Sequence, residues 1–492
     1  MLFSILALYN SSVTHRLIFI QVKNQSDKKT FENTLNHSKS GDYLALFVNT
    51  FKSQFQVARY NQTPRALQYI QGLMTLEKGK ANMERMEEEI PDSEYRAYQH
   101  FITNSNWNYR AVLSKVAKDT SQLLQENKAL SKRPTGLIID ESAHLKKGKE
   151  SIGVSRQYAG VAGKVENCQV GVYLSMVNEN RAGMVDERLY IPSKWINDKP
   201  RGKKAGIPKE EMVFKTKPEL ALEMVDQKIS EGIECDWIGG DGLYGHNRAL
   251  RNGLDKRGLF YVLDVHKDER IFTKRPLFVI PEQKNKKGRP SKKPKPDINS
   301  IRIDTYIKQL TNKDFVVEKQ IRRTHKGWKK LKVHTCTIWL SQGEDQEVIQ
   351  QTLIITQTMD GAKDTKYSFS NGELGAYSPK EYAYFQIQRY WVERTFDDAK
   401  NELGMSDYQI RKWNGWHHHH ALVLMAGLFL LKQKIEGEQE APLMSVRDAR
   451  ILVIVSLFGT PQDVETRLDQ MNTRHLKRQQ DIDRNYKKEQ ET

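Results

Sequence analysis

The segment 134–263 constrains the fold most, because short apolar runs typical of strands are interleaved there with helix-like spacing. Four runs have strand character: residues 137–139, 168–177, 188–191 and 259–263. A fifth, 235–238, is followed by glycines, and apolar residues recur at helical steps over 218–229 and 246–257. Strands followed by helix, strand, helix and strand predict an α/β sheet of mixed direction.

Two of these predicted strands are followed directly by an aspartate. Asp140 follows Leu137-Ile-Ile, and Asp241 follows Trp237-Ile-Gly-Gly. In open α/β sheets, ligands bind beyond the carboxyl ends of the strands. The glycines around Asp241 remove side-chain bulk and would let a phosphate backbone or a metal ion approach. Taken singly, each aspartate is better explained as a helix or turn cap.

A third acid lies far downstream, on a predicted helix that runs from Arg389 to Gly404. Arg389, Glu393 and Lys400 are four and seven positions apart, so they are expected on one side of that helix. Salt bridges on a solvated helix face would explain the triplet on its own. Asp397, one turn from Glu393, is an alternative third acid.

Asp140, Asp241 and Glu393 together predict a cation site, because carboxylates that converge in one cleft repel one another unless a cation lies between them. Hard divalent ions with oxygen ligands meet that need, and Mg²⁺ is typical. Two such ions about 3.5–4 Å apart can activate a hydroxyl and stabilise the leaving oxygen of a phosphodiester. Arg389 and Lys400 are then expected to face phosphates.

The charge of the chain also indicates a polyanionic partner. Its 492 residues carry a formal net charge of +17, which favours nucleic acid over membrane. Three scattered cysteines form neither a zinc motif nor a disulfide framework, so a reducing cytoplasm is expected. The longest apolar run, 421–431, is too short to cross a bilayer.

Six segments are expected. Residues 1–40 form a leader of uncertain structure, and 41–130 are helical, either as a DNA-reading module or as a plain scaffold. The α/β core comprises 131–267 and 381–435, separated by a β-rich basic insertion over 268–380 that contains a flexible basic loop at 284–295. A charged helical tail covers 436–492. In the insertion, Arg322 and Arg323 are expected to contact DNA, and Trp328 is expected either to stack on an unpaired base or to pack as an ordinary strand residue.

These stretches resemble the DDE transposases of bacterial insertion sequences, in the four and seven-hundred-one families. The resemblance is carried by Leu137-Ile-Ile-Asp140-Glu-Ser, by Trp237-Ile-Gly-Gly-Asp241-Gly-Leu-Tyr-Gly245 and by the segment 389–400. It continues through 408–417 and reaches back to 72–107, so it covers most of the chain after about residue 45.

The resemblance implies an RNase H-like core and Mg²⁺-dependent cutting of double-stranded DNA at transposon ends, with Mn²⁺ as an expected substitute. Joining of the 3′-hydroxyl to target DNA follows, and a homodimer or larger assembly on DNA is expected. The family signature orders a tyrosine, an arginine, a glutamate and a lysine along the last acidic helix. Arg389, Glu393 and Lys400 fall on their places, but the tyrosine place is Gln386 here, which leaves the phosphate contact of that tyrosine open.

Two rival functions remain. One is a DNA-binding protein that keeps the fold without cutting, and the other is a host nuclease with the same core. The run His417-His-His-His420 is interpreted as a basic, phosphate-facing helix start and not as a metal site, because four consecutive helical side chains point in four directions.

Overall fold

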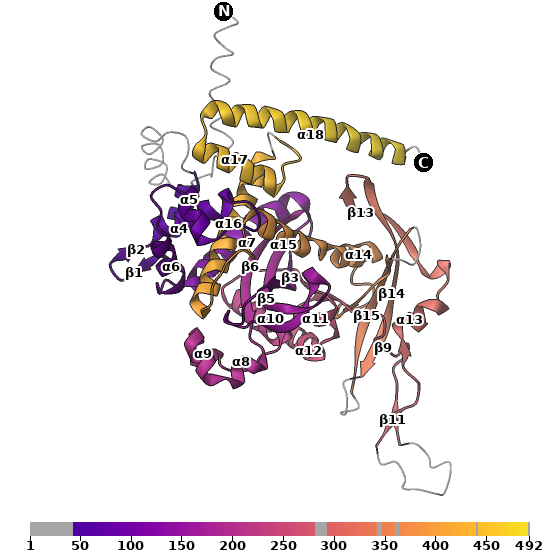
Figure 1. Cartoon of the computed structure of the whole chain (residues 1–492). Helices are drawn as coiled ribbons and strands as arrows, with labels where there is room; N and C mark the ends of the chain where they lie inside the picture. Colours follow the sequence, from indigo (N-terminus) through magenta and orange to yellow (C-terminus); the bar gives the residue numbers. More distant parts are fainter. Residues whose placement is uncertain (1–42, 281–292, 342–346, 360–363, 439–440, 491–492) are drawn as a thin grey trace, which may run out of the picture.

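The computed structural model describes residues 43–280, 293–341, 347–359, 364–438 and 441–490 (Figure 1). The expected leader 1–40 lies outside these ranges, as does most of the basic loop 284–295. The N-terminal part is helical, with a small hairpin, β1 (Gln56–Val57) and β2 (Tyr60–Asn61). Its helices are α3 (Tyr43–Asn49), α4 (Thr63–Thr75), α5 (Met83–Glu89), α6 (Tyr95–Thr103) and α7 (Tyr109–Ser131).

The first half of the sheet region begins with four consecutive strands. They are β3 (Gly136–Leu145), β4 (Ser155–Ala159), β5 (Lys164–Asn178) and β6 (Arg181–Tyr190). Two short helices follow, α8 (Ser193–Asn197) and α9 (Lys199–Ala205). Strands and helices then alternate: α10 (Lys217–Ser230), β7 (Trp237–Gly240), α11 (Gly242–His246), α12 (Arg248–Lys256) and β8 (Tyr261–Asp264).

The second half is mostly strand before it returns to helix. Short pieces come first: β9 (Arg270–Ile271), β10 (Phe278–Val279), β11 (Lys295–Pro296), β12 (Ile301–Arg302) and α13 (Ile303–Tyr306). Four longer strands follow, β13 (Val316–Thr324), β14 (Gly327–Ser341), β15 (Val348–Thr358) and β16 (Lys366–Ser370). The chain ends with α14 (Pro379–Gln388), α15 (Tyr390–Glu402), α16 (Trp413–Gly437), α17 (Val446–Phe458) and α18 (Pro461–Gln490).

Ten of the described strands form one sheet, in the order β13-β14-β15-β16-β8-β7-β3-β5-β4, with β6 also paired to β5. The three central strands β3, β7 and β8 are parallel, and the pairs on either side are antiparallel. This confirms the expected mixed α/β sheet. The strands of the segment 268–380 continue the same sheet, because Ser368 of β16 pairs with Asp264 of β8.

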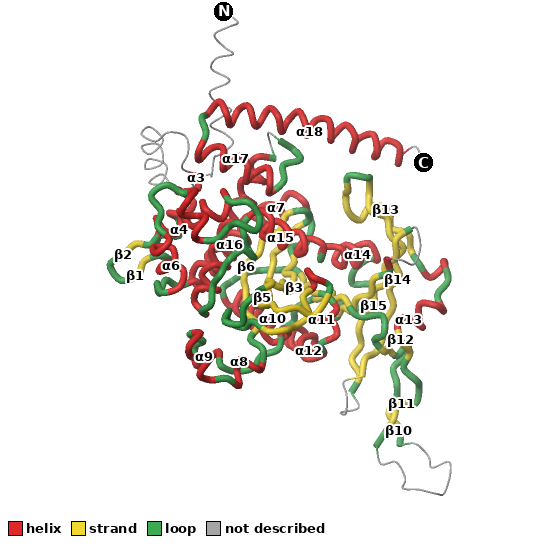
Figure 2. Tube along the Cα trace, viewed as in Figure 1, coloured by secondary structure: helices red, strands yellow, loops and turns green. Residues whose placement is uncertain are grey.

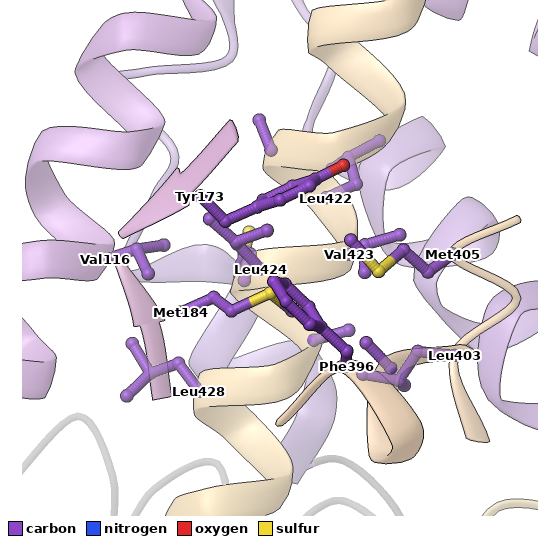
Figure 3. Packing of buried hydrophobic residues seen from close by; sticks show 14 of the residues in the cluster. Val116, Tyr173, Met184, Phe396, Leu403, Met405, Leu422, Val423, Leu424 and Leu428 are labelled. Carbon is purple, nitrogen blue, oxygen red and sulfur yellow. The ribbon is translucent and has the colours of Figure 1, made fainter. Parts of the chain in front are cut away.

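The alternation of residues along a strand decides which helices each side chain meets. Leu137 and Ile139 of β3 belong to the core under α10 and α12, whereas Ile138 belongs to the core on the other face. That other face is covered by α14, α15 and α16. Figure 3 shows Phe396 of α15 packed with Tyr173 of β5 and with the apolar residues of α16.

Helix α16 is the centre of the larger core, and the N-terminal helices α4, α6 and α7 pack against it (Figure 2). Its central residues are buried on all sides, as expected for a helix enclosed by others. None of the described helices combines the length and the hydropathy needed to cross a membrane.

The interpretation of the four histidines as a phosphate-facing helix start is wrong. His417, His418, His419 and His420 are all buried, at 0–1% exposure, in the first turns of α16. The ring of His418 stacks on Trp107 and that of His420 on Trp416. Burial lowers the pKa of each of the four, to about 3 for His419, so they are neutral core residues.

Candidate active site

Three aspartates stand in a row where the three parallel strands stop pairing with one another. Ile139 of β3 pairs with Gly240 of β7, and Gly240 pairs with Leu263 of β8. The next residue on each strand is Asp140, Asp241 and Asp264, and neighbouring strands are about 4.8 Å apart. By alternation, all three lie on the face that α14 and α15 cover, opposite the α10 core.

The sequence suggested that Asp140 ends its strand. In the structure β3 continues beyond Asp140 to Leu145, along β5. It is the pairing with β7 that stops before Asp140, since β7 ends at Gly240. Asp241 therefore leaves the sheet and caps α11, where its Oδ1 accepts a hydrogen bond from Leu243 N over 2.9 Å. A cap and a place in the acid row are thus compatible for the same residue.

Burial and mutual repulsion disfavour the charged form of the acids in this row. Burial and the neighbouring Asp241 raise the pKa of Asp140 to about 8, and Arg389 only partly offsets this. Burial and Glu141 raise the pKa of Asp241, and burial raises that of Asp264. These acids are buried and repel one another, and a bound cation would relieve that repulsion.

Glu393 and Arg389 reach this row from the helical layer. Arg389 lies at the junction between α14 and α15, and Glu393 follows in the first turn of α15. Arg389 Nη1 lies 2.9 Å from Glu393 Oε1 and 3.5 Å from Asp140 Oδ2, and Arg389 Nε lies 3.1 Å from Asp264 Oδ2. One guanidinium therefore joins the helix acid to two acids of the row.

The charge of Arg389 balances only part of this group. Burial lowers its pKa, but Asp264, Glu393 and Asp140 outweigh burial and raise the pKa overall. Glu393 remains open to solvent, with 54% of its side chain exposed. The site thus combines buried acids, one shared arginine and an accessible carboxylate on its rim.

The donor set fits a magnesium ion in its chemistry, since Asp140, Asp241 and Glu393 offer only carboxylate oxygens. In the described part of the chain, no three acid, histidine or cysteine side chains converge as a ready-made metal site. Arg389 Nη1 stands between Asp140 and Glu393 instead. A cation that binds these two acids must therefore displace Nη1 from between them.

Lys400 lies on the same helix, two turns beyond Glu393, over the ring of Phe396. Burial and Lys78 lower its pKa, while Asp397 and Asp140 act in the opposite direction. Lys400 is thus within electrostatic reach of Asp140 and of a second lysine from the loop after α4. Asp397 lies near Lys400 on the exposed side, and Asp398 pairs with Arg394 at 2.9 Å.

The end of α15 fixes this helix against the N-terminal part. Gly404, expected from the sequence to end the helix, has φ +57, in the left-handed region that favours glycine. A Cβ at this position would lie 2.4 Å from Ala81 Cβ. Asp407 then accepts hydrogen bonds from Gly79 N and Ala81 N. The loop that carries Lys78 is therefore tied to the end of the acid helix.

The three residues of the insertion that were expected to contact DNA lie in different places. Arg322 lies over the ring of Tyr390, at 4.4 Å, and near Trp391, so it packs against the start of α15. Arg323 lies over Trp328, and Trp328 meets Tyr486 of α18 edge-on. Glu489 of α18 accepts a hydrogen bond from Trp328 N.

Two acids near the site were missed or set aside on sequence. Asp264 follows an apolar run, 259–263, as Asp140 and Asp241 do, so the same criterion would have found it. The other acid is Glu141, the residue that follows Asp140. It accepts hydrogen bonds from Lys217 Nζ and Tyr244 OH, which hold it beside the row.

Comparison with known proteins agrees with the resemblance stated above. The family model for the DDE superfamily endonuclease matches residues 50–329, which include Asp140 and Asp241 and end before Glu393. A probable transposase for insertion sequence element IS701 from Microchaete diplosiphon is 24% identical over 312 residues, covering 63% of this chain and 67% of that protein. With more than half of its length matched by the family model, the chain belongs to the DDE superfamily endonucleases.

Proposed function

We propose that this endonuclease is a transposase that cleaves the ends of an insertion sequence and joins the 3′-hydroxyl strand to target DNA. The observation that carries the proposal is that Arg389 bridges Asp140 and Glu393, while Asp241 follows the neighbouring parallel strand, within electrostatic reach of Arg389. The parallel centre β3-β7-β8 with its antiparallel flank fits an RNase H-like core.

Asp140, Asp241 and Glu393 would hold two Mg²⁺ ions. When bound, the ions supply Lewis-acid activation of the attacking oxygen and stabilisation of the leaving oxygen. Arg389 and Lys400 then hold the phosphates on either side of the broken bond, the arginine as a fork and the lysine as a point charge. Because Arg389 already pairs with Asp140 and Glu393, its Nη1 changes partner from carboxylate to phosphate as the site fills.

DNA binding is expected along the basic strands of the insertion. On the β13–β14 hairpin, Lys319, Arg323 and Lys326 are exposed. For the helical segment 41–130, the DNA-reading and scaffold alternatives both remain; its helices share the core of α16. Phosphate contacts of this kind make binding strongly salt-dependent. An assembly of two or more copies on paired ends is part of the proposal.

The test is incubation of the full chain with duplex DNA that carries the sequence flanking its own gene. Cleavage at a defined end with Mg²⁺ or Mn²⁺, none with EDTA, and a joined 3′-hydroxyl product on a second duplex are expected. Hydrolysis without joining would favour a host nuclease. Salt-sensitive binding of the ends without cleavage in either metal would favour a protein that binds DNA and no longer cuts it.

A further inference from the structure

A chain of hydrogen bonds runs from the basic insertion to Arg389. Arg389 Nε donates to Asp264 Oδ2 over 3.1 Å, and Ser368 Oγ of β16 donates to Asp264 Oδ1 over 2.7 Å. Gln386 Nε2 of α14 donates to Ser368 Oγ over 2.7 Å. Gln386 Oε1 in turn accepts from Thr356 Oγ1 of β15.

The members of this chain are enclosed. Ser368 is fully buried, and Gln386 and Thr356 are each 2% exposed. Gln386 stands at the place where the family signature has a tyrosine, and here its side chain points into the protein. A residue so enclosed cannot contact a DNA phosphate, so its position serves something inside the protein.

Only one end of Arg389 is held in this way. The Nε edge is bonded to Asp264, while Nη1 faces Glu393 and Asp140. Asp264 itself keeps both oxygens occupied, one by Ser368 and one by Arg389. The arginine can therefore exchange the partners of Nη1 without losing the bond that sets its position.

We propose that Gln386, Ser368 and Asp264 are positioning residues, which hold Arg389 by its Nε edge so that its remaining nitrogens are presented to the acids and to a DNA phosphate. The part of this inference that concerns catalysis rests on the proposed function. The hydrogen-bond chain also ties the placement of Arg389 to β15 and β16, the strands through which the basic insertion joins the sheet.

The first experiment reads the position of Arg389 without any reaction. Protein labelled with ¹⁵N in arginine gives an Nε–H signal for Arg389, identified by its loss in Arg389→Lys. In the parent this proton should exchange slowly with water, and in Asp264→Ala and Ser368→Ala it should exchange faster. The matched control is Ser370→Ala, a buried serine two residues along β16 that accepts from Gly372 N.

The second experiment measures single-turnover cleavage at saturating DNA. Asp264→Ala should lower the rate by about 100-fold, the order expected for a misplaced group. Ser368→Ala removes a hydrogen bond to a carboxylate and should lower the rate by about tenfold or more, and Gln386→Ala removes a bond between neutral groups and should lower it by about threefold to tenfold. DNA affinity should change by less than about twofold, because the ground-state contacts remain. In an Arg389→Ala background, Ser368→Ala should add nothing.

An unchanged Arg389 signal in both Asp264→Ala and Ser368→Ala would overturn the proposal, as would equal losses in Ser370→Ala. If Asp264→Ala fails to fold, Ser368→Ala and Gln386→Ala decide. Absence of cleavage by the parent would remove the proposed function, whereas the exchange measurement would still decide whether these residues hold Arg389.

Discussion

Two acid clusters lie on the same sheet and differ in how their charge is balanced. At the acid row, one arginine pairs with Asp140 and Asp264 and with Glu393 of α15, and Glu393 is largely exposed. On β6, Asp186 alone is surrounded by Arg188 at 2.8 Å, Lys228 at 3.5 Å and Arg110 at 3.5 Å. The first group has too few cations and is open to solvent at Glu393. Asp186, in contrast, has three cations around it and is fully buried.

The pKa values follow that difference. Burial raises the pKa of Asp186, but its three cations outweigh burial and lower the pKa overall. At the acid row, burial and the charge of Asp241 outweigh the charge of Arg389, so the pKa of Asp140 is raised. A surplus of acids with access to solvent indicates a site for a cation, while a balanced and closed cluster holds helices and strands together.

The comparison is tested most severely by neutralising, one at a time, the three acids that are proposed to bind the metal ions. Asp140→Asn, Asp241→Asn and Glu393→Gln should each lower the cleavage rate by about 10³-fold or more, as for one member of a group that acts as a unit. The two aspartate variants should be equally stable or more stable, because repulsion is removed, and Glu393→Gln should change stability by less than about 1 kcal/mol, because that ion pair is exposed. Cleavage assays and urea unfolding of the same preparations check both; retained cleavage in any of the three would remove that acid from the site.

The closed cluster should respond in the opposite way. Asp186→Ala removes the carboxylate that Lys228 and Arg188 share, although Lys228 keeps Glu231 and Arg188 keeps Gln227. It should lower the free energy of unfolding by about 3 kcal/mol, the low end for a broken buried ion pair. Cleavage per folded molecule should be unchanged. The measurement is urea unfolding with the active fraction counted by DNA binding. A loss below about 1 kcal/mol would show that this cluster does not stabilise the fold.

Acid should destabilise the core around α16, where the buried His419 contacts Tyr69 OH at 2.9 Å and lies against the ring of Tyr408. The pKa of His419 lies at about 3 in the folded chain, below the value near 6.5 of an unfolded histidine. The unfolded chain therefore binds more protons below about pH 6.5, and stability falls by about 1.4 kcal/mol per pH unit for each such histidine.

His419→Gln isolates this term. Urea unfolding at several pH values between 7.5 and 5 should show a slope smaller by about one proton than in the parent. The same slope in both proteins would mean that His419 is charged in the folded state.

The smallest effect is expected from a pair that belongs to neither cluster. Arg394 and Asp398 pair on α15 at 2.9 Å, with 45% of the arginine side chain exposed. Arg394→Ala should cost less than about 1 kcal/mol, because solvent screens such pairs. Its cleavage rate should equal that of the parent, which makes it a control for Glu393 on the same helix. A large loss of activity would extend the site to this face.

The sequence indicated the mixed sheet, Asp140 and Asp241 after their apolar runs, and the spacing of Arg389 and Glu393. Period-two strands, helical steps and charge are local properties, so one chain segment suffices to read them. Asp264 was equally readable, since it follows 259–263, but it was not singled out.

Only the tertiary structure decided what surrounds these residues. It buried the four histidines in α16, packed Arg322 against Tyr390, and joined Gln386, Ser368 and Asp264 into one chain of hydrogen bonds. The hydrogen-bonded partners that this chain brings together are up to 125 positions apart in sequence, from Asp264 to Arg389. Burial and hydrogen bonding depend on neighbours from distant segments, and those neighbours are fixed only when the sheet and its helices have assembled.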